Sequence, residues 1–118
     1  MSFDEAIART TAELQMEGFG VLTEIDIKAT LKKKINVELR DYRILGACNP
    51  QYAYKALLAE DKVGTMLPCN VIVRETDDGR IEIAAIDPVA SMQAIGNEEL
   101  GGIAQKIQLK LKHVIENI

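Results

Sequence analysis

Two cysteine–asparagine pairs are the residues of this chain best suited to chemistry. Cys48-Asn49 precedes a proline, Cys69-Asn70 follows one, and no other cysteine occurs in the 118 residues. A thiol beside the start of a helix can have a lowered pKa, because the helix dipole favours the thiolate. Cys48 directly precedes a predicted helix, so a thiol-dependent enzyme or redox sensor using Cys48 or Cys69 is one hypothesis. The structural alternative is that both are small buried residues at strand ends.

A metal site is a weaker hypothesis. Its candidate ligands are Cys48, Cys69 and His113, the only histidine. Structural zinc is held by four ligands in closely spaced pairs, and this sequence has no such pair. It also has neither a phosphate-binding glycine loop nor a Gly-x-Ser-x-Gly elbow. The sequence therefore predicts no metal site and indicates no particular cofactor. It leaves open whether the chain is an enzyme.

The elements around the two pairs decide whether they meet. A strand over residues 42–48 leads into the first pair, and a strand over 69–76 begins with the second. Between them, Asn49 and Pro50 suit the cap and first position of a helix that runs to about residue 60. If that helix is a direct crossover, the strands are parallel and the cysteines lie at opposite sheet edges. Residues 61–68 can instead span up to about 26 Å and return along the sheet, which would place the two cysteines side by side.

The rest of the chain predicts a sheet with helices. Ser2 and Glu5 have the form of a capping box for a helix over residues 3–17. Asp77-Asp78-Gly79 predicts a hairpin turn. Further strands are expected over 19–25 and 80–86, and further helices over 27–35, 88–94 and 98–116. This order predicts an α+β fold: one domain, residues 1–118, with a four-stranded, mainly antiparallel sheet and helices packed on one face.

Charge and composition narrow the classes of function. The chain has 14 basic and 18 acidic residues, for a net charge of −4. Nucleic-acid binders usually carry a basic excess, so we expect no nucleic acid as partner. No apolar run is long enough for a membrane span, and the N-terminus lacks a signal core. We therefore expect a cytoplasmic protein with no membrane contact, in which both cysteines are free thiols.

Strand alternation predicts which sheet face the helices leave open. We expect the helices to cover Phe19, Val21, Ile44, Val71, Val73, Ile81 and Ile83. The open face would then carry an apolar stripe with charged residues around it, namely Leu22, Leu45, Ile72 and Ala84 with Glu24, Arg43, Arg74 and Glu82. Such a patch is typical of a partner surface, so we expect a homodimer to cover it. The alternatives are dimerisation through helices, a small apolar ligand, or residues 88–94 folded over the face.

Several motifs together resemble one family. They are the run from Ile25 to Lys32, the run from Leu45 to Pro50 with Ala53 and Leu57, the run from Leu67 to Val71, and Asp87-Pro88. They are similar to the domain-of-unknown-function 302 family of bacterial and archaeal proteins. The resemblance implies a TATA-binding-protein-like α+β fold and a homodimer, and it implies no activity. Because the family's signature pairs the two cysteine–asparagine motifs, the resemblance also favours the return of residues 61–68 along the sheet, which is the arrangement we expect.

The combined expectation is a small cytoplasmic binding or interaction module. Its unknown small-molecule ligand or partner would bind near the two pairs. The candidate site residues are Cys48, Asn49, Cys69, Asn70, Asp26 and Lys28.

Overall fold

The protein is built on one four-stranded sheet. The computed structural model describes residues 1–118 and places β1 (Gly20–Asp26), β2 (Tyr42–Cys48), β3 (Cys69–Glu75) and β4 (Ile81–Ala85) in chain order across the sheet. All neighbouring strands are antiparallel. The turn between β3 and β4 contains Gly79 with a φ of +84°, a conformation that glycine adopts without steric cost. The predicted hairpin is therefore confirmed.

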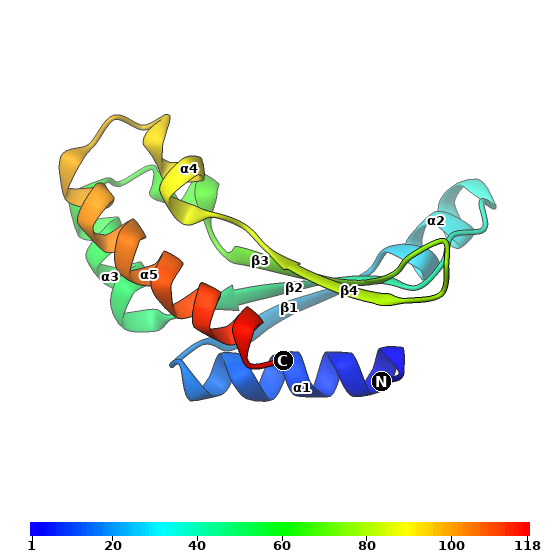
Figure 1. Ribbon diagram of the computed structural model, residues 1–118. Coiled ribbons are helices and arrows are strands. Elements are labelled where there is room, and N and C mark those ends of the chain that lie inside the picture. The colour runs from blue at the N-terminus through cyan, green and yellow to red at the C-terminus, as the bar shows by residue number, and fades with distance from the viewer.

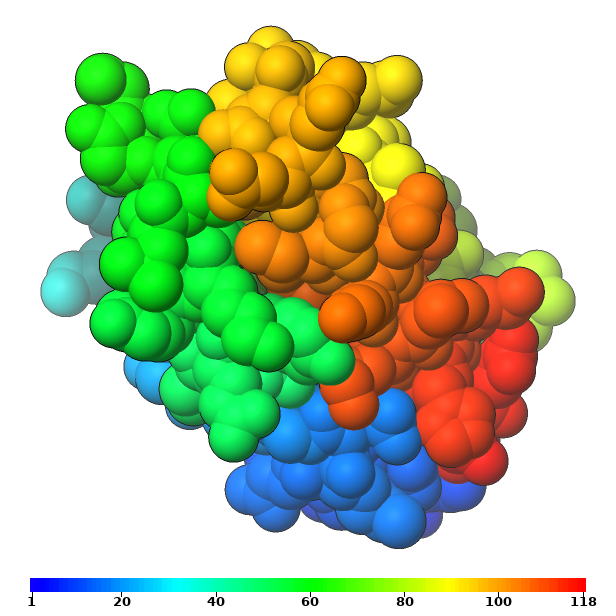
Figure 2. Space-filling model, turned by 90° about the vertical axis from the view of Figure 1, so that its left-hand side faces the viewer, coloured from blue at the N-terminus to red at the C-terminus, as the bar shows by residue number.

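Five α-helices lie on one face of this sheet or beyond its ends. They are α1 (Phe3–Met16), α2 (Ile27–Ile35), α3 (Pro50–Ala59), α4 (Pro88–Gln93) and α5 (Glu98–Glu116). α1 and α5 contact the strands, α3 and α4 pack with α5 beyond one end of the sheet, and α2 lies at the other end (Figure 1). Figure 2 views the molecule from the end where α3, α5 and α1 lie side by side. The α+β prediction is confirmed, and the likeness to the TATA-binding-protein fold stays a prediction.

Polar caps place the helix starts where the sequence predicts them. The Ser2 and Glu5 side chains form both bonds of the capping box. Asp26, Asp87 and Asn97 each accept a hydrogen bond from a backbone N–H in the first turn of the following helix. These bonds satisfy donors that a helix leaves free at its N-terminus. One element is unexpected, a short 3₁₀ helix over Val63–Met66 within the predicted loop.

The core lies between the sheet and the pair α1 and α5. Its fully or almost fully buried members include Leu14 from α1, Leu45, Val71 and Val73 from the sheet, and Leu111 and Val114 from α5. A second, smaller cluster joins α3, α4 and α5 around Ala56, Val63, Met92 and Leu100. No helix in the protein has the length and apolarity that a membrane crossing requires.

The predicted faces of β2 are wrong. Leu45 lies opposite Val71 and Ala47 opposite Cys69, and Leu45 and Ala47 have no exposed surface. Residues directly opposite in an antiparallel pair share a face, so Leu45 and Ala47 face the helices and Ile44 faces away. Arg43 also lies on the helix side, 2.8 Å from Glu24 and with its guanidinium 5.5 Å from the centre of the Phe3 ring.

Two features explain the error. Residues 44–47 are apolar or glycine throughout, so alternation does not distinguish their faces. In β1, a bulge between Val21 and Thr23 shifts the remaining residues by one position. Glu24 therefore lies opposite Leu45 on the helix side, against the prediction.

Candidate functional site

The structure brings the two cysteine–asparagine pairs together. Ala47, the residue before Cys48, lies opposite Cys69 in the β2–β3 ladder. The last residue of β2 and the first of β3 are therefore neighbours at one end of the sheet. The return of residues 61–68 along the sheet is confirmed, and the direct crossover is wrong. What the sequence could not supply is the chemical environment of the two thiols.

Burial raises the pKa of both cysteines. Cys69 is only 5% exposed, and burial, with a smaller contribution from nearby Cys48, raises its pKa to about 11. Burial also raises the pKa of Cys48. Desolvation disfavours the thiolate, which is the nucleophilic form.

Little space remains between the two pairs. A cavity of about 10 Å³ lies among β2, α3 and α5, and its walls include Cys48, Asn49 and Cys69. A single water needs roughly 10–15 Å³ of such volume. The cavity between the two cysteine–asparagine pairs is therefore too small for a small-molecule ligand.

The asparagines make different contacts from those expected. Asn49 occupies the N-cap position of α3, but its side chain caps no N–H there. Its Nδ2 instead donates to the carbonyl of Glu17 at the end of α1, at 3.4 Å. Asn70 is exposed, and its backbone carbonyl accepts the Ile86 N–H at 3.0 Å. Asn49 thus joins the β2–α3 corner to the C-terminus of α1, where helix carbonyls lack partners.

A ligand-sized cleft opens just outside Asn49. It measures about 490 Å³ and lies between the end of α1, the start of α3 and α5. Its walls combine polar and apolar groups, from Met16, Glu17, Gly18, Asn49, Pro50, Gln51, Tyr52 and Lys110. Of the candidate site residues, only Asn49 reaches it.

Asp26 and Lys28 lie at the far end of the sheet. Gly20 at one end of β1 pairs with Cys48, and Asp26 at the other end pairs with Arg43. Six steps along a strand separate these ends by about 20 Å. Asp26 caps α2 through the Ala29 N–H at 2.9 Å and pairs with Arg43 at 3.4 Å, while Lys28 pairs with Asp41 at 3.6 Å. The structure thus separates these two residues from the cysteine–asparagine pairs.

The three weak metal candidates do not come together. No group of three histidine, cysteine, aspartate or glutamate side chains has a metal-binding arrangement. His113 lies on α5 with its Nδ1 3.1 Å from a carboxylate oxygen of Glu17. Cys48, Cys69 and His113 therefore form no ligand set.

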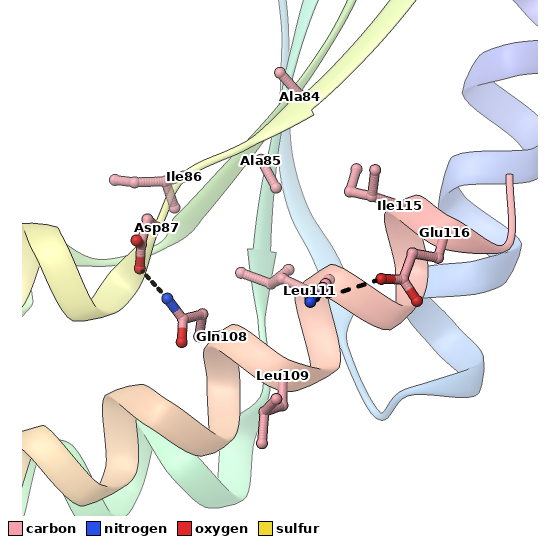
Figure 3. A pocket seen from close by; sticks show the side chains of 10 residues that line it. Ala84, Ala85, Ile86, Asp87, Gln108, Leu109, Leu111, Ile115 and Glu116 are labelled. Atoms are coloured by element: carbon pink, nitrogen blue, oxygen red, sulfur yellow. Dashed lines mark hydrogen bonds and ion pairs between the residues drawn. The ribbon is translucent and has the colours of Figure 1, made fainter.

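A larger cleft, which the sequence did not indicate, lies between β4 and α5. It measures about 580 Å³, and Figure 3 shows the side chains around it. Asp87 accepts a hydrogen bond from Gln108 Nε2 at 2.9 Å, and Lys112 lies 4.0 Å from Glu116. The remaining walls are mostly apolar, from Ala84, Ala85, Ile86, Leu109, Leu111 and Ile115. The only sequence signal there is Asp87, which belongs to the Asp87-Pro88 motif and also caps α4.

Comparison with known families identifies the chain's relatives. The model of a domain of unknown function, DUF302, matches residues 1–118. The chain belongs to the DUF302 family. Among solved structures, it is similar to an uncharacterized conserved DUF302 protein from Bacillus stearothermophilus, with 28% identity and a TM-score of 0.92. The match covers 99% of this chain and 91% of that one. The comparison with curated proteins found no match.

Proposed function

We propose that this DUF302 chain is a one-domain binding module that pairs with a second copy through the open face of its sheet. The observation that carries the proposal is one row of apolar residues across all four strands. Ile25 pairs with Ile44, Ile44 with Ile72, and Ile72 with Ala84. All four side chains therefore point to the face that α1 and α5 leave open.

The surroundings of this row, which we call the isoleucine row, fit a partner surface. Ile25 is 45% exposed, Ala84 is exposed, and Ile44 and Ile72 are half-buried. Beside the row on the same face, Arg74 and Glu82 form an ion pair at 2.7 Å. An apolar strip with a polar border is the usual composition of a protein interface. A second copy supplies an identical strip, which a two-fold symmetric interface requires.

The test of the pairing is the mass of the protein in solution. We expect light scattering to show a dimer for the wild type and a monomer for Ile25→Glu/Ala84→Glu, which places charge at the two exposed ends of the row. Leu58→Glu is the matched control, because Leu58 is 70% exposed on α3. A wild-type monomer, or a folded double variant that stays dimeric, would contradict the proposal. Loss of the dimer in Leu58→Glu would favour dimerisation through helices.

A thiol-dependent function receives no support from the site. Both cysteines have raised pKa values, and the space between them is too small for a substrate. We propose that both remain free thiols that fill space at the ends of β2 and β3. Alkylation with iodoacetamide tests this proposal. Each thiol should react more slowly in the folded protein than after urea unfolding at the same pH, and faster reaction in the folded protein would restore the thiol hypothesis.

A second candidate function is a small-molecule site next to Cys48-Asn49. The observation that favours it is the cleft of about 490 Å³, where Lys110, Gln51 and Tyr52 offer polar groups to a ligand. A thermal-shift screen of small polar acids and amides tests it. A true ligand should raise the melting temperature of the wild type but not that of Lys110→Ala/Gln51→Ala. Leu109→Ala, an exposed change on the same helix, should keep the response.

A further inference from the structure

β4 is an edge of the sheet, and its outer side carries free backbone groups. The Thr76 N–H donates to the Arg80 carbonyl at 2.7 Å, and the Ile86 N–H donates to the Asn70 carbonyl at 3.0 Å. In an antiparallel ladder, every second residue bonds to the neighbouring strand. Residues 80, 82, 84 and 86 therefore bond toward β3, and Ile81, Ile83 and Ala85 direct their N–H and C=O groups outward. No bond of the turns, loops or caps uses those groups.

This edge lacks the features that normally prevent strand addition. Native sheets blunt their edges with bulges, prolines, inward-pointing charges or a covering segment. The opposite edge, β1, has a bulge between Val21 and Thr23 and carries Glu24 on its helix side. In β4, the register with β3 continues without a break from Ile81 to Ala85, and the strand contains no proline. β4 is thus the edge with a regular row of unpaired donors and acceptors.

The cleft between β4 and α5 lies directly beside this edge. Ala84, Ala85 and Ile86 form its strand side. Leu111 and Ile115 of α5 point toward that side from across the cleft (Figure 3). The charged groups at the rim are paired with one another or with neutral partners, as Lys112 with Glu116 and Asp87 with Gln108. The interior therefore favours an uncharged, apolar side chain.

We propose that the β4 edge and this cleft bind an extended peptide segment of another protein, which adds to the sheet as a fifth strand. An extended backbone offers donors and acceptors at the spacing of Ile81, Ile83 and Ala85, which a fatty acid or a flat aromatic molecule does not. Side chains alternate along a strand, so every second peptide residue points to the α5 side. Apolar residues at those positions enter the cleft and provide the selectivity.

Suitable probes are three short capped peptides in which threonine alternates with valine, leucine or phenylalanine. Their binding to the full chain is measured by fluorescence anisotropy. Ala85→Pro removes one outward N–H without breaking a bond to β3, since proline is tolerated where the N–H faces away from the ladder. Ala85→Ser is the matched control, because it keeps that N–H. We expect Ala85→Pro to weaken peptide binding about tenfold and Ala85→Ser to change it little.

A change in the peptide provides a second arm that does not depend on the variant folding. N-methylation of the peptide amides that face β4 should weaken binding, and N-methylation of the alternate amides should not. The proposal would be overturned if none of the three peptides binds, or if the two methylation sets have equal effects. It would also be overturned if decanoate, a fatty acid used as an apolar competitor, binds in the cleft and displaces no peptide. Loss of the dimer in Ala85→Pro would also overturn it, because a second copy would then occupy the edge.

Discussion

At the scale of single residues, Gly46 is restricted by its neighbours rather than by its backbone conformation. It is buried in the middle of β2, opposite Thr23 of β1 and Asn70 of β3. A Cβ at this position would overlap Thr23 Oγ1 and lie 2.9 Å from Cγ of Pro68. Packing therefore requires glycine at position 46, because the missing side chain allows Thr23 of β1 and Pro68 to approach β2.

Substitution of Gly46 by alanine tests this packing. We expect Gly46→Ala to lower the free energy of unfolding by about 1–3 kcal/mol, the usual cost of overpacking a core, as measured by urea denaturation. Thr23→Ala in the same chain should recover part of the loss, because it removes the nearest atom. Gly20→Ala is the control, since nothing lies within 4 Å of a Cβ there. Equal stability of Gly46→Ala and wild type would show that β1 moves aside without cost.

Cys69 makes the stability depend on pH in a calculable direction. Its pKa rises from 9.0 to about 11 on folding because it is buried. Well below pH 9 the thiol is neutral in both states and contributes no pH dependence. As the pH rises from 9 toward 11, the unfolded chain ionises first, so the folded state loses stability, by up to about 2 kcal/mol.

Comparison of variants isolates this effect from lysine and tyrosine titration. The free energy of unfolding of wild type, minus that of Cys69→Ala, should shrink across this pH window in urea titrations. In a Cys48→Ala background, substitution of Cys69 by alanine should still remove this pH dependence, because burial is the main cause of the raised pKa of Cys69. Parallel curves for wild type and Cys69→Ala would show that Cys69 is not desolvated in solution.

At the scale of elements, the sequence predicted the boundaries better than the faces. Caps such as Asp26 and Asn97 are local signals, because the side chain bonds to a backbone N–H two or three residues away. The faces of β2 depend on register against β1 and β3, and the apolar residues 44–47 carry no alternation to reveal it. The β1 bulge has no distinctive residue type either, so neither strand carries a local signal of which residues face the helices.

Sites built by tertiary packing were the least accessible from sequence. The return of β3 beside β2 could be predicted because residues 61–68 are long enough to allow it and the family resemblance pairs the two cysteine–asparagine motifs. The clefts could not, since Asp87 and Gln108, or Asn49 and Lys110, come together only through the position of α5. Candidate residues in short motifs, such as Cys48 and Asn49, were consequently found, and their burial was not.

α5 offers a test at the element scale. Gly101 and Gly102 are exposed within this helix, and a Cβ at either would meet nothing within 4 Å. Alanine restricts the unfolded chain and favours the helix, so each glycine-to-alanine change should add about 0.5–1 kcal/mol to the free energy of unfolding. Thermal and urea unfolding of Gly101→Ala/Gly102→Ala would measure it. Gln105→Gly is the converse control, and a less stable double-alanine variant would indicate that the glycines serve a contact outside this chain.

At the scale of the whole molecule, the sheet presents two different surfaces to partners. The isoleucine row lies on the open face, and the outward groups of β4 lie at the edge, beside α5 on the other face. A face-to-face dimer stacks two sheets about 10 Å apart and leaves their edges accessible. Strand addition lies in the plane of the sheet and uses backbone groups. Ala84 is the one residue that belongs to both the isoleucine row and the wall of the cleft, so the two kinds of binding otherwise use different groups.

Independence of the two surfaces is itself a prediction. Ile25→Glu should be monomeric and bind the alternating peptides with unchanged affinity for each chain, because Ile25 lies on β1, at the opposite edge of the sheet from the cleft. Ala85→Pro should remain dimeric and lose peptide affinity. Light scattering and anisotropy on the same preparations give both readouts, with thermal unfolding to confirm that each variant is folded. If the monomeric variant also fails to bind peptide, the peptide site requires both copies, and the dimer must bring a second chain to the β4 edge. If both properties survive in both variants, neither surface is used as proposed.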